Sequence, residues 1–327
     1  MSSYQHIRYA QQGYQFIVYE VADRIARITL NRPEQVNVQS TAMLEELDHA
    51  IDAAATDTKV RVICLFGAGR HFSAGHDLGS AEETAHREKH PPEDGTRGVF
   101  ERNWRLYVDM HLRWRNVPKP MICAVQGYCI YGGWMVASTA DFIFAAEDAL
   151  FLGSAFQYFS IPYDIHHRMA KELLFQSRFI NARQAKELGL VNRVIAPDRL
   201  VAETLEYAAD VASNDPFDLR ATKLAINQAL DAQGFTAHIH NAHSTYIVRR
   251  LGAADPGYVL PKPASGKRQP MVQVALERYQ RDQQRVQGAG LDESAGTRAS
   301  AGRDASGGSD APASPGAPAG PSATSED

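Results

Sequence analysis

The chain has little cysteine, no long apolar run and no excess of positive charge. Its 327 residues include only three cysteines, without C-x-x-C spacing, which argues against a disulfide framework or a zinc site. No run of about 18 apolar residues occurs, so no membrane span is expected. With 34 Lys and Arg against 38 Asp and Glu, the net charge of -4 argues against nucleic acid as a partner.

The amino terminus lacks the apolar core that a secretory signal peptide needs. Together with the unpaired cysteines, this predicts a protein of the cytoplasm. The composition then predicts five parts of the chain. They are an N-terminal lead (1–14), a core (15–195), a helical region (196–252), a linker with a terminal helix (253–287) and a disordered tail (288–327).

Two short apolar runs, 60–66 and 121–125, are typical of strands buried on both faces of a sheet. Each is followed by a glycine-bearing loop and then by a helical pattern, which predicts an α/β architecture. Alternating apolar residues around Ala22 and Asp23 predict a hairpin, and Ser40 or Thr41 is expected to cap a helix.

Two glycine-containing loops, 67–78 and 125–135, follow these apolar runs. Glycines after a strand allow the backbone to approach a ligand, and an amide at the start of the next helix points outward as a donor. Two such amides directed at one oxygen would form an oxyanion hole. By spacing alone, plain strand-to-helix turns explain the loops better than an oxyanion hole does, because neither a Walker motif nor a G-x-G-x-x-G pattern is present.

The residues themselves resemble the enoyl-CoA hydratase/isomerase family, the crotonase superfamily, over about residues 15 to 250. The motifs are ITLNRP (28–33), GAGR (67–70), FSAGHDL (72–78), AVQGYCIYGG (124–133) and ARQAKELGLVNRVI (182–195). The resemblance implies a right-handed spiral of β-β-α units with a C-terminal helical region that builds a homotrimer or a homohexamer. It also implies an acyl-CoA substrate, and an oxyanion hole formed by the amides of His76 and Gly132.

Two positions depart from the family pattern. A hydratase of this family uses two glutamates, and those positions are occupied here by Met135 and, approximately, Ala155. Neither side chain transfers a proton, so the usual two-carboxylate addition of water is not expected.

The sequence around His76 and Tyr163 resembles the methylmalonyl-CoA decarboxylase branch, although that branch retains a glutamate where Met135 stands. Decarboxylation needs no base to begin, and a histidine or tyrosine could orient the carboxylate or supply the late proton. The predicted catalytic residues are His76, Gly132, Tyr163 and His166. The predicted substrate-binding residues are Arg70, Ala74, Tyr131, Trp134, Met135 and Phe156.

Three functions remain open from the sequence. The first is decarboxylation of a 2-carboxyacyl-CoA, and the second is C–C bond hydrolysis or hydration with a relocated acid and base. The third is an acyl-CoA binder without activity. We expect no metal and no cofactor, with CoA present only as part of the substrate, and the acyl group stays undetermined.

Overall fold

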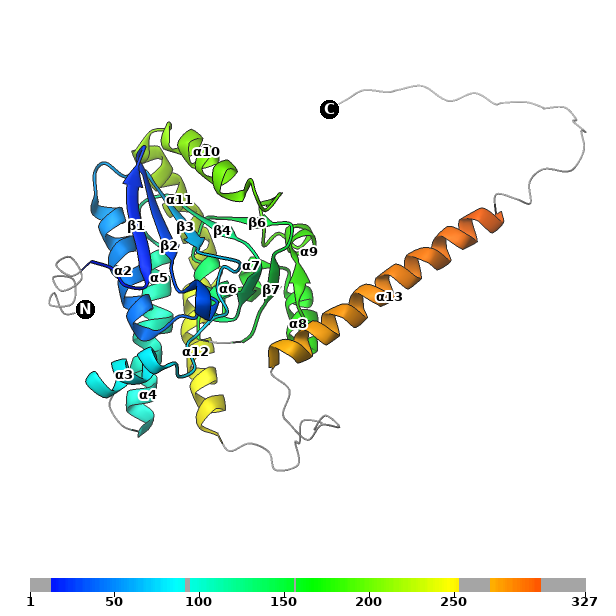
Figure 1. Cartoon of the computed structure of the whole chain (residues 1–327), viewed down its shortest axis with the longest axis horizontal. Coiled ribbons are helices and arrows are strands. Elements are labelled where there is room, and N and C mark those ends of the chain that lie inside the picture. The colour runs from blue at the N-terminus through cyan, green and yellow to red at the C-terminus, as the bar shows by residue number, and fades with distance from the viewer. Residues whose placement is uncertain (1–12, 92–94, 156, 253–270, 301–327) are drawn as a thin grey trace, which may run out of the picture. The chain divides into compact units, whose positions relative to one another are not determined.

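The computed structural model describes residues 13–91, 95–155, 157–252 and 271–300 (Figure 1). The chain separates into two compact units, Met1–Tyr279 and Gln280–Asp327. Both sheets belong to the first unit. The predicted lead (1–14), except its last two residues, and the tail beyond residue 300 lie outside the described residues.

The first unit is built on a six-stranded sheet and a three-stranded sheet. The large sheet has the order β1-β2-β3-β4-β6-β9, in which only β1 is antiparallel to its neighbour. The small sheet has the order β5-β7-β8. The strands are β1 (Ile17–Ala22), β2 (Ile25–Leu30), β3 (Val62–Gly67), β4 (Met121–Val125), β5 (Tyr128–Ile130), β6 (Phe142–Ala146), β7 (Leu150–Leu152), β8 (Ile180–Asn181) and β9 (Arg193–Ile195).

Helices surround these sheets, and the mixed α/β fold predicted from the sequence is confirmed. Three long helices, α10 to α12, follow the last strand. The helices are α2 (Thr41–Thr56), α3 (Ala81–Lys89), α4 (Gly95–Asn103), α5 (Met110–Arg115), α6 (Gly132–Ala137), α7 (Ile161–Asp164), α8 (His167–Gln176), α9 (Ala182–Glu187), α10 (Leu200–Ala212), α11 (Pro216–Ala232), α12 (Phe235–Leu251) and α13 (Met271–Ser300). A 3-10 turn, η1 (Pro33–Gln35), and a π-helical segment, η2 (Trp104–Asp109), complete the set.

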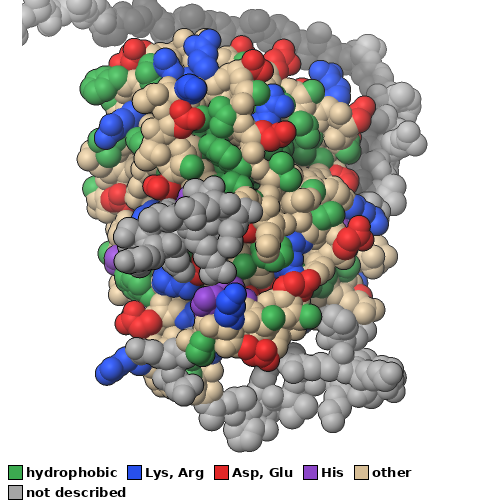
Figure 2. Space-filling model, turned by 60° about the vertical axis from the view of Figure 1, so that its left-hand side comes forward, with side chains coloured by type: hydrophobic (Ala, Val, Ile, Leu, Met, Phe, Trp, Pro, Cys, Tyr) green, Lys and Arg blue, Asp and Glu red, His purple; other side chains and the backbone are tan. Residues whose placement is uncertain are grey.

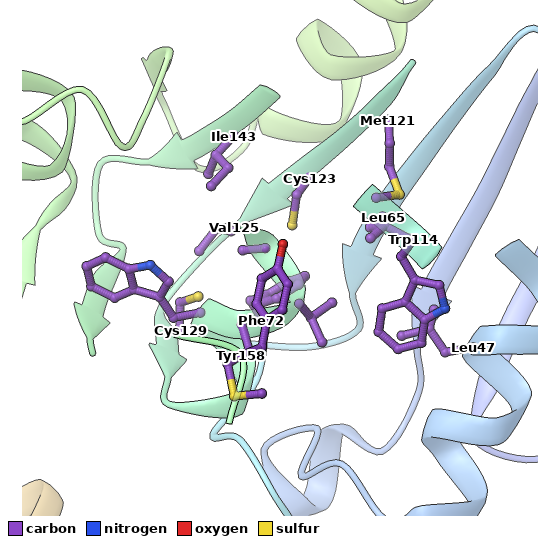
Figure 3. Close-up of a cluster of buried hydrophobic side chains, with 14 of the residues drawn as sticks. Leu47, Leu65, Phe72, Trp114, Met121, Cys123, Val125, Cys129, Ile143 and Tyr158 are labelled. Atoms are coloured by element: carbon purple, nitrogen blue, oxygen red, sulfur yellow. The ribbon is translucent and has the colours of Figure 1, made fainter. Parts of the chain in front are cut away.

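Strand β4, inside the large sheet, is buried on both faces, and its alternate residues point to opposite sides. Met121, Cys123 and Val125 of β4 belong to the main core, which includes α2 (Figure 3). Ile122 and Ala124 belong to a second cluster, which includes α10. Two-sided burial explains why β4 reads as a continuous apolar run in the sequence.

Local signals set several element ends, among them the predicted hairpin and the predicted Ser40 cap. The β1–β2 turn contains Asp23 and Arg24, both with positive φ, as a tight hairpin requires. Ser40 caps α2, its hydroxyl accepting from the Met43 amide at 3.1 Å. Asn181 caps α9 in a reciprocal capping box with Gln184.

The end of the chain requires a correction. The sequence predicted a disordered tail from residue 288, whereas α13 continues to Ser300. Residues 288–300 include three glycines among small residues, and their helical course continues a helix that has already begun at Met271.

On the face shown in Figure 2, basic and acidic side chains are interspersed with apolar ones. Among the described residues, no helix has the length and apolar character needed to cross a bilayer. Cys64, Cys123 and Cys129 are buried free thiols, and burial raises the pKa of each.

A buried ion pair fixes the loop that precedes α3. The carboxylate of Asp77 lies 2.9 Å from a guanidinium nitrogen of Arg32, and both side chains are almost fully buried. The Asp77 carboxylate also accepts hydrogen bonds from the Gly79 amide at 3.0 Å and from the amide and hydroxyl of Ser80, both at 2.7 Å. Burial alone would raise the pKa of Asp77, but these hydrogen bonds outweigh it and lower the pKa to about 2.

We predict that Asp77→Asn lowers the free energy of unfolding by about 3 kcal/mol, because it leaves the buried Arg32 charge without its carboxylate. Since the folded pKa lies below the unfolded value, the stabilisation is present above about pH 4 and is lost as pH falls toward 2. Urea denaturation measures both effects. Glu82→Gln is the control: this exposed partner of Arg32, at 3.3 Å, should leave the midpoint nearly unchanged. An equal effect of both variants would contradict the assignment.

Candidate functional site

The structure brings the two predicted glycine loops into direct contact. The Ser73 amide donates to the Tyr128 carbonyl, and the Ile130 amide donates to the Ser73 carbonyl, each at 2.9 Å. A Cβ added at Gly75 would stand 2.6 Å from the Ile130 carbonyl oxygen and 3.0 Å from the Gly132 nitrogen. Only glycine at position 75, which also has a φ of 88°, permits this approach.

The turn after β5 aims a backbone amide at this junction. Gly132 is the first residue of α6, where an amide has no acceptor within its own helix. Tyr131 before it has a φ of 50° and a ψ of -102°, a conformation that is costly for a residue with a side chain. Its amide donates to the Leu152 carbonyl at 2.8 Å, which fixes the turn to the small sheet.

The His76 side chain packs against the same glycine. A Cβ added at Gly132 would meet the His76 ring at 2.5 Å and Gln39 Oε1 at 2.6 Å. The ring stacks on Tyr107, with centroids 4.1 Å apart, and its Nε2 atom has no exposed surface. Burial, and then the positive charge of Arg102, lower the pKa of His76 to about 3. The imidazole is therefore neutral at pH 7.

Three residues of this site, Gln39, Tyr107 and His111, were missed by the sequence analysis. Tyr107 and His111 are four residues apart, in η2 and α5, so they share one helical face. Burial, and then the proximity of His76, lower the pKa of His111 to about 3. The four-residue spacing of two polar aromatic residues was the signal available in the sequence.

Two predicted catalytic residues lie in other contacts. The Tyr163 hydroxyl donates to the Gln233 carbonyl at 3.2 Å, and its ring packs edge-on against Phe235. His166 is exposed and caps α8, its ring nitrogen accepting from the Arg168 amide at 3.4 Å. No contact of either residue with His76 or Gly132 is found within the described ranges. A catalytic role for Tyr163 and His166 thus stays a prediction without support from these contacts.

Two predicted substrate-binding residues on α6 are part of the core. Trp134 is buried, and its Nε1 donates to Asp164 at 3.0 Å. Ser138 and Ser160 donate to the same carboxylate oxygen, each at 2.8 Å. Met135 is 4% exposed and lies in the main cluster. These contacts hold α6 in place after the turn at Tyr131.

The other predicted substrate-binding residues are spread along the two loops. Ala74 is half-buried, and its amide donates to the Val36 carbonyl at 2.9 Å. Arg70 is exposed on the first loop. Tyr131 packs on Ile130, Leu152 and Phe179, beside the first turns of α13. Phe156 lies outside the described residues. Within the part of the chain that the structure describes, no group of three or more His, Cys, Asp or Glu side chains is placed to hold a metal ion.

Comparisons with known proteins agree with this fold. A family model described as enoyl-CoA hydratase/isomerase matches residues 20–247. A putative enoyl-CoA hydratase of Mycobacterium tuberculosis, EchA13, is 38% identical over 245 residues, which span 68% of this chain and 77% of that protein. The chain belongs to the enoyl-CoA hydratase/isomerase family.

Solved structures show the same relationship. A probable enoyl-CoA hydratase from Mycobacterium smegmatis is 43% identical with a TM-score of 0.66, and the match covers 71% of this chain and 93% of that one. An enoyl-CoA hydratase/isomerase from Xanthobacter autotrophicus is 36% identical with a TM-score of 0.66, covering 74% and 90%. These likenesses confirm the crotonase-like fold expected from the sequence.

The contact between Gly132 and the His76 ring gives a testable coupling. Gly132→Ala places a methyl group against the ring, so we expect the free energy of unfolding to fall by about 2 kcal/mol. In a His76→Ala background only the Gln39 contact remains, so the destabilisation caused by Gly132→Ala should be smaller by about 1 kcal/mol. A double-mutant cycle by urea denaturation measures the coupling. Additive effects would mean that the two residues do not touch.

The lowered pKa values of His76 and His111 make the fold sensitive to acid. Their folded pKa values of about 3 lie below the unfolded value near 6.5, so stability is full above pH 6.5 and declines as pH falls toward 3. His111→Phe should reduce the slope of unfolding free energy against pH by up to about 1.4 kcal/mol per pH unit in that window. Denaturation series at pH 6 and pH 4.5 provide the measurement. An unchanged slope would show that His111 titrates normally.

Proposed function

We propose that the chain processes an acyl-CoA thioester through an enolate held by the backbone amides of His76 and Gly132. The meeting of the two loops at Gly75 is the observation that carries this proposal. Amides fixed by backbone packing stabilise a developing oxyanion without reorganising during the reaction. CoA enters only as part of the substrate.

Within this chemistry we propose decarboxylation of a 2-carboxyacyl-CoA. The bond from C2 to the carboxyl carbon breaks, carbon dioxide leaves, and the electron pair forms the thioester enolate. A proton then adds at C2 and gives the shortened acyl-CoA. Met135 and Ala155 occupy the positions where the family's hydratases have glutamates, so a route that needs no initial base is favoured.

The surroundings of the junction support the same reaction. His76 and His111 are neutral at pH 7; His111 is fully buried, and the Nε2 atom of His76 is buried although the residue is partly exposed. A carboxylate moved from water into such surroundings is less stable, whereas the transition state disperses its charge as carbon dioxide forms. A neutral imidazole also carries one N–H, so His76 is the candidate donor for the final proton: the more basic enolate takes this proton at C2, and water then returns a proton to the ring nitrogen.

Hydration with a relocated acid and base is the second candidate. The relatives described above carry the name enoyl-CoA hydratase. In this chain the same neutral histidines, rather than carboxylates, would have to move the protons of water.

Mass spectrometry of reactions with methylmalonyl-CoA and crotonyl-CoA in parallel tests the two reactions. Decarboxylation lowers the mass of methylmalonyl-CoA by about 44 units, and hydration raises the mass of crotonyl-CoA by about 18 units. We expect only the first change, with His76→Ala lowering its rate by about a hundredfold because a proton donor is lost. His167→Ala, at an exposed position, is the control and should retain activity. A mass gain of about 18 units with crotonyl-CoA alone would show hydration in place of decarboxylation. No mass change with either substrate would indicate an acyl-CoA binder without activity.

Two further expectations from the sequence are also proposals. A homotrimer or homohexamer is supported by exposed apolar side chains on α11 and α12, such as Phe217, which is 74% exposed, and Val248, which is 73% exposed. A cytoplasmic location is supported by the three buried free thiols.

A further inference from the structure

Four buried side chains near the oxyanion junction carry polar atoms that have no hydrogen-bond partner within the described ranges. The atoms are Gln39 Oε1, both ring nitrogens of His111, Gln157 Oε1 and the Tyr158 hydroxyl. None of the four residues is more than 2% exposed. We call these four residues the polar cluster. Because an unpaired buried polar atom costs free energy of folding, such a group calls for an explanation.

Gln39 lies directly at the junction. Its amide donates to the Gly75 carbonyl at 2.8 Å, and its carbonyl accepts from the Asp77 amide at 3.0 Å, so it runs beside His76. Its side-chain Nε2 donates to the Ser73 hydroxyl at 3.2 Å. Gln39 Oε1 is left facing Gly132, 2.6 Å from the place of a Cβ on that residue.

His111 approaches the junction from the helix. Tyr107, one turn before it, stacks on the His76 ring, and His76 also influences the pKa of His111. The carbonyl of Leu106 affects that pKa too, but its geometry falls short of a hydrogen bond. His111 is therefore held in position by ring contacts with Trp114 at 4.6 Å and Tyr158 at 5.3 Å, not by polar partners.

Gln157 and Tyr158 form the far part of the cluster. Gln157 Nε2 donates to Asn103 at 2.6 Å, which fixes the side chain and leaves Oε1 unpaired. Tyr158 belongs to the main core with Phe72, Cys123 and Val125 (Figure 3). Burial raises its pKa, so the hydroxyl keeps its proton and can donate.

We infer that the polar cluster selects an acyl group that carries an oxygen substituent, such as a hydroxyl, keto or carboxyl group, over a plain alkyl chain. The cluster offers neutral donors and acceptors, which match an oxygen function and gain nothing from a hydrocarbon. A site built to hydrogen-bond a substrate rejects an analogue that lacks the group, because its own polar atoms stay unpaired. This inference rests on the proposed function only in placing an acyl thioester at the His76 and Gly132 amides.

Calorimetric titration of the full chain with matched thioesters tests the inference without requiring turnover. The ligands are butyryl-CoA, 3-hydroxybutyryl-CoA, acetoacetyl-CoA and methylmalonyl-CoA. We expect at least one oxygenated ligand to bind about tenfold or more tightly than butyryl-CoA. Equal binding of all four would overturn the inference.

Two apolar variants tie the preference to the cluster. His111→Phe and Gln39→Met should each reduce the preference about tenfold, chiefly by weakening the oxygenated ligand. His243→Phe is the matched control, because His243 is another fully buried histidine with unpaired ring nitrogens, packed against Phe100 and Trp104. It should leave the preference unchanged. A preference that survives both cluster variants would overturn the assignment to these residues.

Stability supplies a readout that a purely structural role would not give. His111→Phe replaces a ring with two unpaired nitrogens by an apolar ring of similar shape, so it should preserve or raise the unfolding midpoint of the ligand-free protein. Gln39→Met also loses the hydrogen bond to Ser73, so this readout comes from His111→Phe, and a lowered midpoint for that variant would contradict the inference. If one variant fails to fold, the other and the wild-type ligand series still decide.

The outcome is distinguishable from that of the proposed reaction. Carbon dioxide release without a binding preference would leave decarboxylation standing and refute the selection by the cluster. A binding preference without carbon dioxide release would support selection by the cluster and refute decarboxylation.

Discussion

The close approach of two backbone segments at Gly75 is the constraint on which the site depends. The first loop and the β5–α6 turn touch there without any side chain between them, and a Cβ at position 75 would stand 3.0 Å from the Gly132 nitrogen, closer than ordinary van der Waals contact. The His76 ring in turn rests against Gly132, where a Cβ would stand 2.5 Å from the ring.

The chain treats its buried polar groups in two different ways. Asp77 and Arg32 are paired and hydrogen-bonded, as a buried charge must be to persist. Asp164 likewise receives three donors on one oxygen. Gln39 and His111 are buried equally well and keep polar atoms unpaired in the described structure. The unpaired atoms of Gln39 and His111 differ from those of His243 in lying beside the junction of the two glycine loops, which is why we assign them to the substrate.

The sequence predicts best what depends on neighbours along the chain. The Ser40 cap, the Asn181 capping box and the buried strand at 121–125 all follow from residue types at fixed spacing. Residues that act through distant partners are harder to assign. Tyr163 follows a proline in a motif, but its hydroxyl is taken by Gln233, seventy positions further along the chain.

The same distinction explains His111 and the last helix. His111 meets His76 only through a helix packed on the glycine loop, so spacing alone does not reveal the pair. The helical course of residues 288–300 depends on a helix already started at Met271, which a count of small residues overlooks.

Residues beyond the family match also take part in holding the site. The match ends at residue 247, yet Ala275 of α13 is 2% exposed and shares a cluster with Ile130 and Leu152. Tyr131, held at a costly φ of 50°, packs on that cluster and precedes Gly132. A strained residue persists only where its surroundings determine its position. The first turns of α13 therefore belong to the packing that keeps the Gly132 amide in place, although no motif of the family extends to them.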